Sequence, residues 1–116
     1  MDRITIFQQA IIAVMDNYIT DYHHSRVGIN DVKYEKVIDF NNHHYQLIQL
    51  GWIEKKQRVF ELIFHVDIID DKIWIQEDSL EYSVAERLGD QGIGKKDIVL
   101  AYFTVSHRQY TEYAVF

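Results

Sequence analysis

Three consecutive strand-like segments between His43 and Gln76 constrain the fold of this chain most. Each of the segments 44–53, 58–69 and 73–75 mixes apolar with polar residues. Short polar stretches separate them at Glu54–Gln57 and Asp70–Asp71. Strands joined by such short turns pair with their sequence neighbours in an antiparallel sense. The sequence therefore predicts an antiparallel meander, with 58–69 as its longest strand.

The alternation within this longest strand predicts which side chains share a face. One face is expected to carry Phe60, Leu62, Phe64, Val66 and Ile68, and the other Glu61, Ile63, His65, Asp67 and Ile69. In the preceding strand the apolar phase slips near Leu47–Ile48, and Gly51 indicates a β-bulge.

A helix and a further strand are expected before the meander. Apolar residues recur every three or four positions over Ile4–Tyr22, which predicts an amphipathic helix. Ser25–Asp31 is expected to be a loop, and Val32–Phe40 alternates as a strand. Asn41–Asn42 then predicts a hairpin turn, since Asn tolerates positive φ.

After the meander, Ser83 and Glu86 form a capping box that predicts a short helix ending near Gln91, with Gly92 as its stop. Residues 98–103 are consistent with either a buried strand or a helical turn, and 113–116 predict a terminal strand. The order predicts a single α+β domain over 1–116: a long N-terminal helix packed on an antiparallel sheet of about four strands, with a short C-terminal helical segment.

Composition limits the function. The net charge is −6, from 18 acidic and 12 basic residues, so non-specific affinity for nucleic acid should be weak. There is no cysteine, no secretory layout at the N-terminus, and no apolar run near the ~18 residues of a membrane span. We expect a cytoplasmic protein without membrane contact.

The histidines and acidic turns do not predict a metal site or a cofactor. His23–His24 and His43–His44 are adjacent pairs, and adjacent residues on a strand point to opposite faces. The chain has no HExxH motif and no cysteine to complete a zinc set. Asp67, Asp70 and Asp71 lack the EF-hand pattern and are expected to form an acidic turn.

His65 and Asp67 share a strand face at positions i and i+2, so the carboxylate could orient the imidazole as a general base of a small hydrolase. No nucleophile stands at a recognisable spacing, and we favour the alternative of a solvated sheet face. No catalytic residue is therefore predicted.

Lys55, Lys56 and Arg58 form the densest basic run, beside Trp52 and Phe60. Basic residues next to aromatic ones can hold single-stranded nucleic acid. A solvated hairpin tip is the alternative, and the acidic net charge favours it.

Apolar residues stand on both predicted faces of the central strands, which a sheet with one solvated face would not need. Tryptophan is also enriched at the energetic centres of protein interfaces. We therefore expect a second helix, a subunit or a partner protein to cover the second face. The candidate partner surface comprises Trp52, Ile63, His65, Asp67 and Trp74.

Several ungapped phrases of the sequence are specific in wording and order. They are His44–Leu47 (HYQL), Gly51–Trp52 (GW), His65–Ile68 (HVDI), Lys72–Gln76 (KIWIQ) and Asp97–Leu100 (DIVL). Together they resemble the XisI family, the fdxN-element excision controlling factors. The resemblance covers most of the chain and implies the fold of that family.

The same resemblance implies a function without catalytic residues. Its expected role is to control the excision of a DNA element that interrupts a nitrogen-fixation operon, during heterocyst differentiation in cyanobacteria. The recombinase would be a separate protein, and a XisH-like protein the partner. A homo-oligomer is expected on general grounds, most commonly a two-fold dimer.

Overall fold

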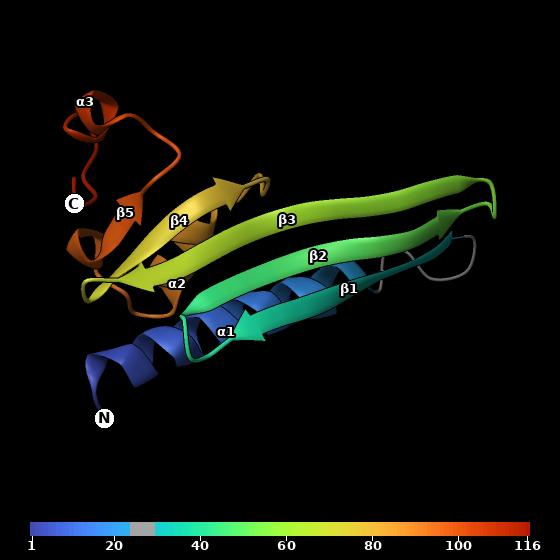
Figure 1. The fold of residues 1–116 in the computed structure, drawn as a ribbon, viewed down its shortest axis with the longest axis horizontal. Coiled ribbons are helices and arrows are strands. Elements are labelled where there is room, and N and C mark those ends of the chain that lie inside the picture. The colour runs from blue at the N-terminus through green and yellow to red at the C-terminus, as the bar shows by residue number, and fades with distance from the viewer. Residues whose placement is uncertain (24–29) are drawn as a thin grey trace.

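The computed structural model describes residues 1–23 and 30–116, and two helices cover one face of its mixed five-stranded sheet (Figure 1). The elements are α1 (Arg3–His23), β1 (Asn30–Asp39), β2 (His44–Ile53), β3 (Gln57–Ile69), β4 (Lys72–Asp78), α2 (Val84–Asp90), the 3₁₀ turn η2 (Lys95–Asp97), β5 (Ile98–Leu100) and α3 (Val105–Arg108). The molecule measures 44 × 33 × 25 Å. It is elongated because the β2–β3 hairpin extends past the end of α1 (Figure 1).

The sheet order β1-β2-β3-β4-β5 follows the sequence. The first four strands are antiparallel, as predicted, and β5 lies parallel to β4 after a crossover through α2. The prediction of about four strands missed β5, which has only three residues and therefore no readable alternation. The predicted strand at 113–116 is wrong beyond a single bridge between Ala114 and Val99.

The predicted N-terminal helix is confirmed, and its apolar stripe forms the centre of the core. Phe7, Ile11, Val14 and Met15 are buried against the inner face of β2–β4 and against α2. The helix begins after Asp2, whose Oδ1 accepts a hydrogen bond from the Thr5 N–H at 2.8 Å. No described helix combines the length and the apolar character needed to cross a bilayer. Residues 25–29 of the predicted loop lie outside the described residues, while Asn30 and Asp31 already belong to β1.

A β-bulge in the middle of the long hairpin changes which side chains face the helices. Leu47 pairs with Phe64 but Ile48 pairs with Leu62, so Ile63 is the extra residue in β3. The irregularity was predicted at this position, but on β2 instead of β3. Since one extra residue reverses the alternation, Phe60 and Leu62 do not share a face with Phe64. The expected single apolar face of β3 is wrong in its outer half.

The predicted turn between β1 and β2 is confirmed and depends on Asp39. Its Oδ1 accepts hydrogen bonds from the backbone N–H groups of Asn41 and Asn42 at 3.0 and 3.1 Å, and its Oδ2 accepts one from Asn42 Nδ2 at 2.8 Å. His43 completes the turn with φ of 59°. These hydrogen bonds, chiefly those from Asn42, lower the pKa of Asp39 below its ordinary value of 3.8.

Asp39 is therefore expected to make the stability of the protein pH-dependent on the acid side. Because its pKa is lower in the folded state, the ionised carboxylate stabilises the fold above its unfolded pKa, and this contribution is lost as pH falls through the folded pKa. Urea unfolding of wild type and Asp39→Asn from pH 7 to pH 3 should show a smaller acid loss in the variant. The exposed Glu81→Gln variant is the charge-matched control, and an equal change in both would contradict the assignment.

The Ser83 cap of the short helix is confirmed. Ser83 Oγ accepts a hydrogen bond from the Glu86 N–H at 3.1 Å, and α2 ends one residue before the expected position. Gly92 has φ of 92°, the left-handed conformation predicted for the stop. The helix contributes Val84 and Leu88 to the core.

Arg108 connects the C-terminal segment after β5 to the sheet. This buried guanidinium donates hydrogen bonds of 3.1–3.2 Å to four backbone carbonyls, those of Leu100, Ala101, Phe103 and Val115. It also lies over the Trp74 ring, 5.5 Å from the centroid. One side chain thus joins the segment after β5 to both β4 and β5.

Candidate functional site

The candidate site is the face of β1–β3 that lies opposite α1, here called the open face. Directly paired residues of β2 and β3 form rows across it: Trp52 with Arg58, Leu50 with Phe60, Ile48 with Leu62, Gln46 with His65, and His44 with Asp67. Their neighbours on β2, such as Tyr45, Leu47 and Gln49, are buried on the helix side. Among the described residues, the C-terminal segment covers this face over β4 and β5, where Arg108 packs on Trp74.

Five apolar side chains occupy the outer half of the open face, and we call them the apolar patch: Ile48, Leu50, Trp52, Phe60 and Leu62. Phe60 is 65% exposed and Trp52 is 42% exposed. The patch lies on the part of the hairpin that leads to its far tip (Figure 1). The bulge at Ile63 causes this exposure, because it turns Phe60 and Leu62 away from the helices.

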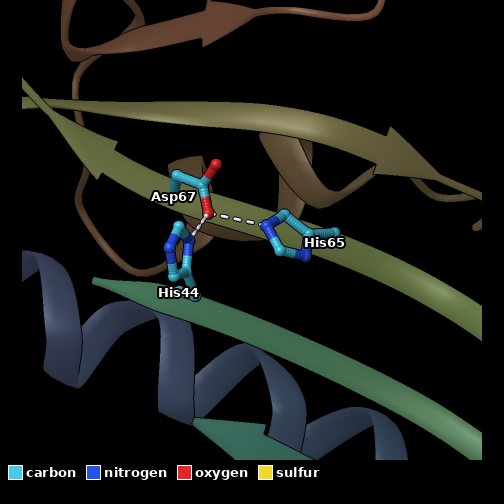
Figure 2. Close-up of side chains that lie close together, drawn as sticks. All are labelled: His44, His65 and Asp67. Atoms are coloured by element: carbon cyan, nitrogen blue, oxygen red, sulfur yellow. Dashed lines mark hydrogen bonds and ion pairs between the residues drawn. The ribbon is translucent and has the colours of Figure 1, made fainter. Parts of the chain in front are cut away.

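A polar cluster of His44, His65 and Asp67 occupies the inner half of the open face. Figure 2 shows both imidazoles directed at the same carboxylate oxygen, with His44 Nδ1 and His65 Nε2 each 2.6 Å from Asp67 Oδ1. His44 is the direct cross-strand partner of Asp67, and His65 precedes Asp67 by two residues on β3. Antiparallel pairing and strand alternation therefore bring all three together.

Two glutamines complete the hydrogen bonding of this cluster. Gln46 Nε2 lies 2.8 Å from His65 Nδ1, and Gln76 Nε2 donates to Asp67 Oδ2 at 3.3 Å. The pattern is satisfied when His65 is protonated on Nε2, donates to Asp67 and accepts from Gln46 at Nδ1. Both nitrogens of His65 are then engaged, so this ring has no lone pair left with which to accept a proton from a substrate.

His44 and Asp67 differ in their exposure to solvent. The Asp67 side chain is 11% exposed and the His44 side chain is 53% exposed. The hydrogen bond that His44 donates to Asp67 is the main cause that raises the pKa of His44 above 6.5, and the charge of Asp39 acts in the same direction. Within the described part of the chain, Asp67 makes no ion pair with lysine or arginine. Two histidines therefore take the place that a lysine or arginine would have beside this carboxylate.

Sequence reasoning placed His65 and Asp67 together correctly but missed the other members of the cluster. His44 belongs to an adjacent pair for which no site is predicted, and Gln46 and Gln76 are not among the predicted site residues. The signal that could have found His44 is the hairpin register, because a pairing of His44 with Asp67 follows once the turn at 54–56 and the bulge at Ile63 are fixed.

Not all residues of the predicted partner surface are accessible on the open face. Trp52, His65 and Asp67 lie on the open face, whereas Trp74 is packed under Arg108. Ile63 must be removed from the set, because it is only 6% exposed and belongs to the core cluster. As the extra residue of the bulge, it turns inward with Phe64.

The residues of the predicted nucleic-acid contact lie at the tip of the β2–β3 hairpin, at the end far from the chain termini (Figure 1). Lys55, Lys56 and Arg58 are all exposed there. The Arg58 guanidinium lies 5.5 Å from the centre of the Trp52 ring, so the basic tip and the apolar patch are continuous.

These features define an α+β protein with an antiparallel meander and one parallel strand, β5, at the edge of the sheet. Its open face is divided into a polar and an apolar half. A family model described as XisI protein matches residues 1–115. The chain belongs to the XisI family, as the sequence resemblance predicted.

Two crystal structures of proteins from Anabaena variabilis ATCC 29413 are similar to this chain. One is a XisI-like protein with 31% identity and a TM-score of 0.73, covering 96% of this chain and 99% of that one. The other is the fdxN element excision controlling factor XisI, with 30% identity and a TM-score of 0.76, covering 99% of this chain and 100% of that one. No curated protein matches the chain. The similarity confirms the expected XisI-like fold.

Proposed function

We propose that this protein is a non-enzymatic regulatory factor that controls site-specific excision of the fdxN DNA element, together with a XisH-like partner and a separate recombinase. Membership of the XisI family and the similarity to an fdxN element excision controlling factor support the role. The uncovered apolar patch is the observation that supports binding of a partner. Action as a homo-oligomer, location in the cytoplasm and direct DNA contact by Lys55, Lys56 and Arg58 stay predictions.

The apolar patch has the character of a protein interface. A solvated sheet face normally alternates with polar residues, whereas here Trp52, Phe60 and Leu62 are exposed side by side on neighbouring strands. Contiguous exposed apolar surface with aromatic residues marks interaction sites. Arg58 stacked on Trp52 adds a residue type that is enriched in interface hot spots.

Charge also supports a partner that handles nucleic acid. A protein that contacts DNA carries basic surface, and the net charge of −6 on this chain would attract it and accelerate its association. The patch would then supply the buried contact area.

The polar cluster supports a role without catalysis. The hydrolase interpretation required His65 as a general base, but His65 Nε2 is paired with Asp67 and His65 Nδ1 with Gln46. In this arrangement the cluster links β2 to β3 and β4, and neither nitrogen of His65 is free to face a substrate.

Replacing Phe60 by aspartate is expected to weaken the complex with the XisH-like protein of the same genome by at least about tenfold, since a central interface aromatic contributes about 2 kcal/mol or more. Size-exclusion chromatography with light scattering should show a hetero-complex for wild type. Biolayer interferometry then gives the affinities of wild type and variant.

Tyr110→Ala is the matched control, because Tyr110 is an exposed aromatic residue (87%) in the C-terminal segment, away from the patch. It should bind as wild type does. Two separate chromatographic peaks for wild type would contradict the partner role. A complex that tolerates Phe60→Asp would contradict the apolar patch as its binding surface.

A further inference from the structure

We propose that His44, His65 and Asp67 form a binding site for a divalent transition-metal ion of the zinc class. The three side chains each present one ligand atom, and these atoms all lie within 4.8 Å of one another. They come from two paired strands of the rigid sheet, so their positions are fixed before a metal arrives.

The donor set selects the class of ion. Two imidazole nitrogens and one carboxylate oxygen are ligands that Zn²⁺ accepts readily, whereas Ca²⁺ and Mg²⁺ prefer oxygen donors alone. Three protein ligands leave at least one coordination position for water or for a group from a partner. His44 is half-exposed, so that position would face solvent on the open face.

The contacts of the two imidazoles with the carboxylate need a modest adjustment to accept the ion. Zinc at about 2.0–2.1 Å from each ligand would hold neighbouring ligand atoms roughly 3.3 Å apart. The two nitrogens now lie 2.6 Å from Asp67 Oδ1, as hydrogen bonds require. The metal would replace the two bridging protons and lengthen each nitrogen–oxygen distance by less than 1 Å. His44 stands at the first position of β2, where its exposed side chain has room to move.

The surroundings of the cluster resemble the outer shell of a metal site. Ligating histidines usually engage their second nitrogen in a hydrogen bond, and ligating carboxylates are themselves hydrogen-bonded. Gln76 performs the second function for Asp67. Gln46 would perform the first for His65 by turning its amide, so that Oε1 accepts from the Nδ1–H that the ring carries when Nε2 binds the metal. Asp39 adds a second negative charge close enough to act on His44. The local field therefore favours a cation.

Isothermal titration calorimetry with zinc chloride tests the site on the full chain. Wild type should bind one Zn²⁺ per chain. His44→Ala and His65→Gln should weaken binding more than Gln76→Ala, for which the loss of an outer-shell partner predicts about 10–100-fold. His107→Ala is the matched control, because His107 is an exposed imidazole on α3 and should leave the affinity unchanged. Cobalt(II) should give the visible absorption of a site with nitrogen ligands in wild type and lose it in His44→Ala.

Far-UV circular dichroism must first show that each variant is folded, and the exposed position of His44 makes His44→Ala the safer of the two ligand variants. Absence of saturable zinc binding would overturn the proposal. So would His44→Ala and His65→Gln proteins that bind zinc as tightly as wild type, or an equal loss in His107→Ala. The titration uses no partner protein, so its failure would leave the partner role intact.

Discussion

Arg108→Ala is expected to lower the free energy of unfolding by about 2–4 kcal/mol, the largest effect we predict for a single side chain. The guanidinium donates to four carbonyl oxygens at once, and its removal leaves groups such as Ala101 O and Val115 O without this donor. The variant also loses the packing of Arg108 on Trp74. Urea unfolding monitored by tryptophan fluorescence measures the change directly.

Arg108→Lys separates the shape of the group from its charge. An ammonium keeps the positive charge but cannot direct donors to four carbonyls in the planar arrangement of a guanidinium, so we expect most of the stability loss to remain. Arg58→Ala is the control on an exposed arginine and should change stability little. A loss in Arg108→Ala no larger than that in Arg58→Ala would contradict the role of Arg108.

Gly51→Ala is expected to cost about 3 kcal/mol, because two independent features require glycine at this position. The residue has φ of 148°, a conformation that side chains other than glycine rarely adopt. A Cβ atom here would lie 1.9 Å from the carbonyl oxygen of Asp31 and 2.7 Å from the Cα of Val32. Since both neighbours are backbone atoms of β1, the edge strand would have to move away from β2.

Gly89→Ala provides the comparison. Gly89 lies in α2, and a Cβ atom there meets no other atom within 4 Å, so the higher helix propensity of alanine should leave stability equal or slightly increased. Urea unfolding of both variants gives the two free energies, and hydrogen exchange should show β1 as the less protected strand in Gly51→Ala. A cost in Gly51→Ala no greater than that in Gly89→Ala would contradict this explanation.

Much of the architecture could be predicted from local patterns. The stripe on α1, the antiparallel meander, the Asn41–Asn42 turn and the Ser83 cap all follow from residues close together in sequence. The face of Phe60 and Leu62 could not be predicted, because both are apolar yet point to solvent beyond the bulge. Alternation alone cannot show which residue of an irregular strand is the extra one. Gly51 was interpreted as a bulge, but it pairs without a shift and allows the close approach of Asp31.

The candidate site was predictable only in part for a related reason. His65 and Asp67 are two residues apart, so strand geometry places them together. His44 joins them from 21 residues earlier, and Arg108 reaches Trp74 from 34 residues later. Such contacts depend on the register and on the crossover, which no local pattern specifies. Arg108 in particular gives no sequence signal, since an isolated arginine usually lies on the surface.

The sheet order has a consequence for how the chain folds. Four strands pair with their immediate sequence neighbours, so each pairing closes a short loop and loses little chain entropy. The parallel pairing of β5 with β4 closes a longer loop that contains α2, and the bonds from Arg108 follow it in sequence. The hairpins can therefore form early in the folding reaction, while the parallel strand docks late. The C-terminal segment that Arg108 holds then packs onto the sheet as the final step.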